Sequence, residues 1–162
     1  MLRKLAFVSL LLAGVWWFWP LDEATRLRAL PPRLAAAFSA GSVGTCLDAF
    51  AAEYHDHSEG SRVDKETLRA ALLGRLAAGR GADFVARVPA ESIQLVEFDA
   101  ERGTARLDFA LELGRVSAAS AEFGAADVDW ALDVEASLAR DEHGDWRFVR
   151  SVHRTRGGRR PG

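Results

Sequence analysis

The sequence contains one cysteine, Cys46, among its 162 residues. A single cysteine cannot form an intramolecular disulfide, and it cannot supply the thiolate cluster of a structural zinc site. We interpret Cys46 as a small, buried, apolar residue.

An excess of basic charge is also lacking, because the formal net charge is −2 and the sequence pI is about 6.1. Such a chain has no overall positive field to attract nucleic acid, so a nucleic-acid partner is disfavoured. The sequence also lacks a Ser/His/Asp order, a glycine-rich phosphate loop and an aromatic and basic platform. We therefore expect no cofactor and assign no catalytic residue.

The first 21 residues have the pattern of a membrane anchor. Arg3 and Lys4 precede the apolar stretch 5–19, in which Ser9 is the only polar residue, and Pro20 follows it. Fifteen helical residues span roughly 22 Å of a hydrocarbon core about 30 Å thick, so the anchor is short.

The end of this stretch argues against cleavage. Trp16, Trp17 and Trp19 stand where a signal peptidase requires small residues, and tryptophan is typical of a membrane interface. Val15 stands where a lipoprotein signal needs cysteine. We expect a single-pass protein of the inner (cytoplasmic) membrane of a bacterial envelope, with its C-terminal domain in the periplasm.

Three helical segments are expected next. Residues 22–33 form a juxtamembrane linker or helix interrupted at Pro31 and Pro32, and the folded domain spans residues 34–154. Ser42 caps a second helix, and Asp64 caps a third. The apolar stripe of the second helix is Val43, Leu47, Phe50, Ala51 and Tyr54, and that of the third is Leu68, Leu72, Leu73 and Leu76.

Alternation of apolar and polar residues predicts strands in the second half. Residues 84–98 form two short strands or one bulged strand around Pro89, and clear strands cover 105–113 and 128–138. Their apolar residues face the core, while Asp108, Asp129 and Asp133 face the other side. A last strand carries Trp146, Phe148 and Val152 on one face, and residues 155–162 form a disordered basic tail.

The order of three helices followed by a curved antiparallel sheet, ending in Asp145-Trp146-Arg147-Phe148-Val149-Arg150, resembles the nuclear transport factor 2-like superfamily. Segments 47–54, 65–69 and 144–149 carry the resemblance, which covers roughly residues 34–154. It implies an α+β fold in which helices and sheet form a cone with a pocket between them. The superfamily includes SnoaL-like cyclases and ketosteroid isomerases, and also binding and scaffolding modules.

The expected pocket is bordered by aromatic residues of the core face, with one cation at its mouth. Its residues are Phe50, Tyr54, Phe109, Trp130, Trp146, Phe148 and Arg150. Arg150 shares the parity of Phe148 and could hold an anionic ligand, but a bulge near Val149 or a salt bridge explains it equally. His55-Asp56-His57 has no spaced second ligand pair, so no metal site is predicted.

Three functions remain open. The leading hypothesis is non-catalytic binding of a small apolar ligand or a protein partner, because the core-facing positions of the clear strands hold no acid. The second is an isomerase, dehydratase or cyclase that uses Tyr54, Asp56 or His57, and Arg150, which requires a buried titratable group about 3 Å from a donor. The third is a scaffold subunit of an envelope complex, such as a type IV secretion system. The sequence leaves the oligomeric state open.

Overall fold

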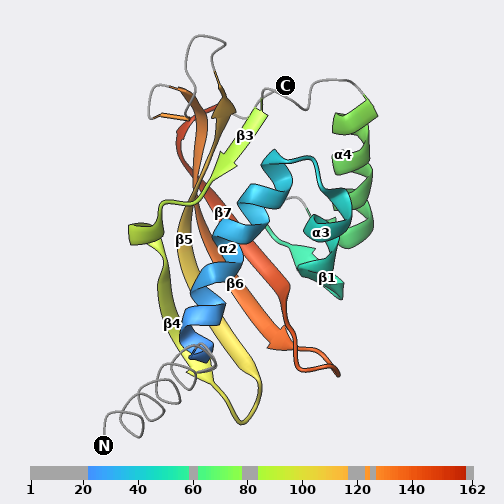
Figure 1. Cartoon of the computed structure of the whole chain (residues 1–162), viewed down its shortest axis with the longest axis vertical. Coiled ribbons are helices and arrows are strands. Elements are labelled where there is room, and N and C mark those ends of the chain that lie inside the picture. Colours follow the sequence, from blue (N-terminus) through green and yellow to red (C-terminus); the bar gives the residue numbers. More distant parts are fainter. Residues whose placement is uncertain (1–21, 59–61, 78–83, 117–122, 125–126, 160–162) are drawn as a thin grey trace, which may run out of the picture.

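The computed structural model describes residues 22–58, 62–77, 84–116, 123–124 and 127–159 (Figure 1). The predicted anchor over residues 1–21 lies outside this range. Within the described part, no helix is both long enough and apolar enough to cross a membrane. The helices are α2 (Glu23–Ser39), α3 (Val43–Asp48), α4 (Lys65–Ala77) and the short 3₁₀ helix η1 (Ala90–Ser92). The strands are β1 (Phe50–Asp56), β2 (Val63–Asp64), β3 (Phe84–Arg87), β4 (Gln94–Asp99), β5 (Thr104–Arg115), β6 (Val128–Arg140) and β7 (Trp146–Gly158).

The strands form one curved sheet in the order β2-β1-β7-β6-β5-β3, and β4 pairs with β5 beside β3. All neighbours are antiparallel except β1 and β7, which run parallel. The α+β class and the three helices of the prediction are present, but the sheet is mixed rather than antiparallel. The two parallel strands are far apart in the sequence, since α4 and five strands lie between β1 and β7 in the chain.

Helix α2 lies across one face of the sheet, which we call the helix face (Figure 1). Leu27 and Pro31 are fully buried, and Leu27 packs in one cluster with Leu107 and Leu138 of the sheet. The helix continues through both prolines. The helix alternative for residues 22–33 is therefore present, whereas the interruption predicted at Pro31 and Pro32 is wrong. Burial of Leu27 and Pro31 makes this segment part of the domain.

The predicted helix from residue 43 to residue 54 is also wrong. Helix α3 ends at Asp48, and residues from Phe50 onward form β1. The spacing of Phe50 and Tyr54 fits a strand as well as a helix, because residues four positions apart lie on the same face of either element. Pairing with β7 decides in favour of the strand.

Helix α4 begins as predicted. The backbone N–H of Thr67 donates to Asp64 Oδ1 over 2.8 Å, so Asp64 satisfies a free donor of the first turn. The helix carries Leu72 into a small cluster with Cys46 and Ala37, while Leu73 is exposed. Cys46 is buried and free, as expected, and burial raises the pKa of its thiol.

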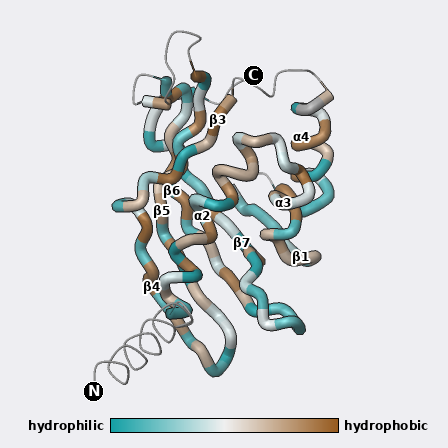
Figure 2. The backbone as a smooth tube through the Cα atoms, viewed as in Figure 1, coloured by the Kyte–Doolittle hydropathy of each residue, from teal (hydrophilic) through white to brown (hydrophobic). Residues whose placement is uncertain are grey.

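The long strands β5 and β6 alternate as predicted. Leu107 and Phe109 of β5, and Leu132 and Val134 of β6, are buried in the cluster that contains Leu27. Asp129 and Asp133 are exposed on the opposite side of the sheet, which we call the outer face. Figure 2 shows hydrophobic and hydrophilic residues interspersed along these strands. The strands predicted on either side of Pro89 are β3 and β4.

Strand β7 differs from the prediction in two ways. Ser137 of β6 pairs with Arg150, whereas the next residue, Leu138, pairs with Phe148, so Val149 is an extra residue in β7. This bulge reverses the parity of the residues from Arg150 to Thr155, and a second register shift follows between Thr155 and Gly157. The strand also continues to Gly158, so a disordered tail from residue 155 is wrong for residues 155–158. Residues 160–162 lie outside the described part.

Candidate functional site

The helix face of β1 and β7 carries a row of polar side chains. Asp56 pairs with Ser151 in the parallel register, and His153 pairs with Val134 of the core. Paired residues share a face of the sheet, so Ser151 and His153 point toward the helices. Tyr54 and Asp56 of β1 point to the same side by alternation.

Asp56 and His153 form the central pair of this row. His153 Nδ1 lies 3.0 Å from Asp56 Oδ2. The side chains are largely buried, with 13% of Asp56 and 22% of His153 exposed. Because a carboxylate only accepts hydrogen bonds, this contact places the imidazole proton on Nδ1.

The other nitrogen of His153, Nε2, is left as the acceptor of the neutral ring. Among the residues that the structure describes, none donates to or accepts from Nε2. An imidazole held at Nδ1 by a carboxylate, with an unbonded Nε2, has the arrangement of a general base. A proton taken up at Nε2 creates an imidazolium that Asp56 stabilises.

Ser58 fixes both members of the pair. It is 2% exposed, its hydroxyl donates to Asp56 Oδ1, and it accepts the backbone N–H of His153 over 2.6 Å. Both Asp56 oxygens are therefore hydrogen-bonded. This restricts rotation of the carboxylate that orients the imidazole.

Tyr54 lies one step along the row. Its hydroxyl is 2.7 Å from Ser151 Oγ, and its side chain is 7% exposed. Burial, partly offset by the bond to Ser151, raises the pKa of Tyr54 to about 12. Tyr54 therefore stays protonated and can act only as a neutral hydrogen-bonding group.

Trp130 of β6 flanks the imidazole. The two rings are nearly perpendicular, with centroids 5.9 Å apart. The indole N–H donates to Thr155 Oγ1 over 3.1 Å. This contact holds a flat aromatic surface beside His153.

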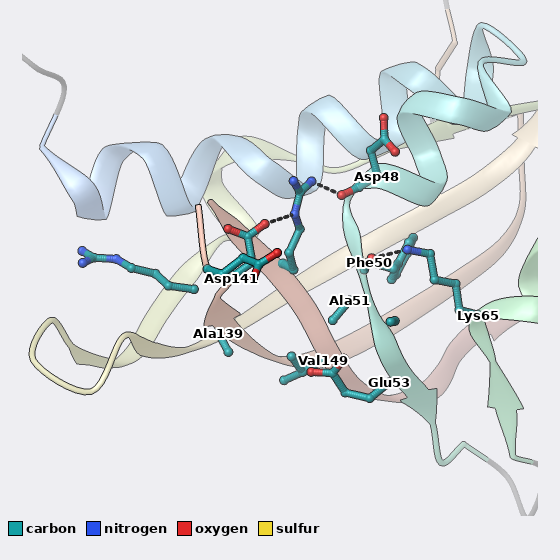
Figure 3. Close-up of a pocket in the computed structure, with 12 residues that line it drawn as sticks. Asp48, Phe50, Ala51, Glu53, Lys65, Ala139, Asp141 and Val149 are labelled. Atoms are coloured by element: carbon teal, nitrogen blue, oxygen red, sulfur yellow. Dashed lines mark hydrogen bonds and ion pairs between the residues drawn. The ribbon is translucent and has the colours of Figure 1, made fainter. Parts of the chain in front are cut away.

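A separate open groove of about 470 Å³ lies at the start of β1, beside the turn between β6 and β7 (Figure 3). Arg147 crosses it, donating from Nε to Asp141 Oδ2 over 3.0 Å and from Nη1 to the carbonyl of Asp48. Lys65 Nζ donates to the carbonyl of Phe50 over 2.6 Å. The cations Arg147 and Lys65 of this groove therefore already have hydrogen-bond partners.

Comparison with solved structures gives the same architecture. An NTF2-like protein with a cystatin-like fold from Novosphingobium aromaticivorans has a TM-score of 0.66 at 16% identity, covering 98% of this chain and 92% of its own. Aln2 from a Streptomyces species has a TM-score of 0.62 at 20% identity, covering 84% and 93%. A protein from Novosphingobium aromaticivorans described as a putative aromatic ring hydroxylase has a TM-score of 0.61 at 13% identity, covering 85% and 92%.

The chain has the nuclear transport factor 2-like fold. No family model and no curated protein matches the sequence. At these identities the likeness concerns the fold alone, so the chemistry depends on this chain's own residues.

Within this fold, the aromatic residues expected to border a pocket are divided among several places. Phe50 packs against Tyr54 and Phe148, with ring centroids 4.4 and 5.6 Å away. Phe109 is buried in the same core cluster. Trp146 contacts Phe98 and the guanidinium of Arg140, away from Trp130 beside His153.

Arg150 does not belong with these aromatic residues. Its partner in β6 is Ser137, which lies between the buried residues Ala136 and Leu138, so Arg150 is on the outer face and exposed. The predicted place of Arg150 at the pocket mouth is therefore wrong, because the bulge at Val149 turns its side chain to the outer face. The alternative of a bulge at that residue is confirmed.

The His55-Asp56-His57 segment is split between the two faces. The rings of His55 and His57 lie 4.6 Å apart, and Asp56 points the other way, to His153. No group of three or more metal-ligating side chains occurs among the described residues.

The sequence-based interpretation missed His153. Without the bulge, its parity places it on the outer face, together with Arg147 and Val149. The one available signal was the pair Val152-His153. Unbroken alternation from Trp146 places Val152 on the helix face and the neighbouring His153 on the outer face. Only the register of β6 and β7 shows the reversal.

Proposed function

We propose that this chain binds a small organic molecule beside Trp130 on the helix face, and that His153 takes a proton from it. The supporting observation is the 3.0 Å contact of Asp56 with His153 Nδ1, which leaves Nε2 unbonded among the described residues. The reaction class is an isomerase, dehydratase or cyclase, in which removal of a proton next to a carbonyl starts the reaction.

The substrate is a planar carbonyl compound in this proposal. The perpendicular indole of Trp130 offers an apolar surface, and the Tyr54 hydroxyl and Ser151 offer neutral hydrogen-bonding groups nearby. Such groups suit an uncharged molecule, because hydrogen bonding between neutral groups avoids burying an unpaired charge.

Exchange of carbon-bound protons tests the proposal without a known substrate. The full-length chain is incubated in D₂O with a panel of cyclic and aromatic ketones, and deuterium next to the carbonyl is followed by NMR. We expect His153→Gln to reduce exchange by about 10²-fold or more, the usual contribution of a general base. His143→Gln is the matched control, since His143 is exposed in the turn between β6 and β7.

A non-catalytic ligand-binding module is the second candidate. It is favoured by the helix-face positions from Ala105 to Leu113 in β5 and from Trp130 to Leu138 in β6, which hold apolar residues. This function predicts ketones or other apolar ligands that bind and raise the melting temperature, with no deuterium exchange above background. Exchange that is lost in His153→Gln and retained in His143→Gln excludes it.

We also propose that residues 1–21 anchor the domain to the inner membrane, with the domain on the periplasmic side. The support is the apolar stretch 5–19 with its basic start and tryptophan-rich end. A C-terminal reporter that is active only outside the cytoplasm, combined with membrane fractionation, tests both points. A reporter active only in the cytoplasm contradicts the orientation, and recovery in the soluble fraction contradicts the anchor.

A further inference from the structure

Four basic side chains gather on the outer face near the edge of the sheet that β2 and β1 form. His55 lies directly beside Arg150 in the parallel pairing of β1 and β7. The rings of His55 and His57 are 4.6 Å apart at an interplanar angle of 81°. Arg150 and Arg62 are both close enough to His57 to affect its charge. Together these residues form the basic cluster.

The two arginines of the basic cluster differ from the other arginines of this face. Arg87 bonds Glu112 at 2.6 Å, Arg106 bonds Glu97 at 3.1 Å, and Arg156 bonds Glu112 at 3.5 Å. Within the described residues, Arg62 and Arg150 have no acidic partner, and both are exposed.

The acids near the basic cluster are engaged or directed elsewhere, with one exception. Asp56 points to the helix face and bonds His153. Asp64 lies opposite His55 in β2, but its Oδ1 accepts the Thr67 N–H. Glu53 is exposed two residues before His55 and is the remaining acid of β1.

The protonation of His57 reflects this surplus of positive charge. Desolvation, followed by the positive potentials of His55, Arg150 and Arg62, lowers the pKa of His57, and only Asp56 acts in the opposite direction. A bound anion reverses these effects, because it offsets the charges that disfavour the imidazolium.

We infer that the basic cluster binds a phosphate monoester or inorganic phosphate, a small dianion that matches two guanidinium groups and two imidazoles. A planar guanidinium group can donate two parallel hydrogen bonds to two oxygens of one phosphate. Each imidazole adds a further donor when it is protonated. His55 Nδ1 contacts the Glu53 carbonyl at 3.1 Å, which directs its other nitrogen away from the backbone. This site is separate from Asp56 and His153, which face the helices.

Titration of the full-length chain with inorganic phosphate at constant ionic strength tests the site. The histidine ring signals are followed by NMR, with chloride as the monoanion control. We expect saturable shifts of the His55 and His57 signals and weakening of binding by about tenfold in Arg150→Gln, the effect of losing one charge-assisted hydrogen bond. Arg154→Gln is the matched control, because Arg154 is an exposed arginine on the same strand and face. Absence of saturable shifts, or equal weakening in both variants, overturns the inference.

Titration with sulfate distinguishes protonation of the protein from protonation of the ligand. Sulfate remains a dianion from pH 8 to well below about pH 6, whereas His57, whose pKa is lowered, gains a proton as the pH falls. Sulfate binding should therefore tighten toward the lower pH, and His57→Gln should reduce the change. A pH-independent affinity contradicts a role for the imidazoles.

The source of the phosphate group is identified by two further arms. Glycerol phosphate represents soluble monoesters, and vesicles of phosphatidylcholine containing phosphatidic acid represent a lipid headgroup. Binding in either arm that is weakened by Arg150→Gln supports the site and identifies the molecule that carries the phosphate group. Failure of both, with no binding of inorganic phosphate, overturns it.

Discussion

Phe148 and Arg150 are two residues apart in β7, yet their side chains lie on opposite faces of the sheet. Phe148 pairs with Leu138 and is 3% exposed, whereas Arg150 pairs with Ser137 and is exposed. In a regular strand, residues at this spacing share a face. The bulge at Val149 therefore determines the chemistry of the domain, because it turns Ser151 and His153 toward Tyr54 and Asp56.

Tyr54 and Ser151 provide a test of this orientation. The 2.7 Å bond between their side chains joins β1 to β7 at the reversed parity. Tyr54→Phe and Ser151→Ala should each destabilise the domain by about 1 kcal/mol. In urea unfolding, the double variant should lose clearly less stability than the sum of the two single variants, because each single change removes the same hydrogen bond. Strict additivity contradicts the contact.

Asp108 on the outer face is expected to destabilise the fold at neutral pH. Its Oδ1 is buried without a hydrogen-bond partner, and Glu135 lies directly opposite. Desolvation, then repulsion by Glu135, raises the pKa of Asp108. The pKa of Asp108 is higher in the folded than in the unfolded state. The ionised carboxylate therefore destabilises the fold fully at pH values above the folded pKa, and this destabilisation disappears below the unfolded pKa.

Asp108→Asn should therefore stabilise the protein at pH 7 by roughly 0.2–1 kcal/mol, the range for removing a like-charge cross-strand pair. Thermal unfolding at a series of pH values measures the effect, which should shrink as the pH falls through the range where Asp108 protonates. Asp129→Asn, an exposed acid of the same face, should change stability little. A gain in Asp108→Asn that persists at pH values below 3.8, the ordinary pKa of an aspartate, excludes this explanation.

Gly114 allows the close approach of residue 127 at the bulge between β5 and β6. A Cβ at this position would lie 1.8 Å from the carbonyl oxygen of Asp127, which is backbone and cannot rotate away. Gly114→Ala should destabilise the domain by roughly 1–3 kcal/mol. Gly157→Ala is the control, because a Cβ there meets no atom within 4 Å. Equal effects in urea unfolding would contradict the close contact.

Asp141 organises the turn between β6 and β7. Its Oδ1 accepts the backbone N–H groups of Asp145 and His143, and its Oδ2 accepts Arg147 Nε. The Asp145 N–H, followed by Arg147, lowers the pKa of Asp141. Asp141→Ala should lower the melting temperature at neutral pH, and the difference should vanish as acid protonates the native carboxylate. Glu142→Ala should have little effect, and a deficit that persists in strong acid argues against this cause.

Alternation predicted the regular part of the fold. Leu107, Phe109, Leu132 and Val134 repeat strictly, so their strands, their faces and the outward acids follow from the sequence. The cap at Asp64 was also predictable, because an aspartate before an apolar helical pattern satisfies the free backbone donors of the first turn.

Long-range pairing determined the features that the sequence did not predict. Phe50 and Tyr54 fit a helix or a strand, and only the parallel contact with β7, nearly a hundred residues later, selects the strand. The bulge at Val149 has no glycine or proline to mark it. Because the residues from Arg150 to Thr155 change face, one unmarked insertion moved His153 into the site and Arg150 out of it.

The tautomer of His153 tests the account most directly. Long-range ¹H–¹⁵N NMR of the full-length chain assigns the protonated nitrogen of each of the four histidines. The contact with Asp56 predicts that the neutral form of His153 carries its proton on Nδ1, and that the nitrogen pattern changes in Asp56→Asn, whose amide can donate to Nδ1. A His153 that carries its proton on Nε2 and is unaffected by Asp56→Asn would contradict the proposed general base.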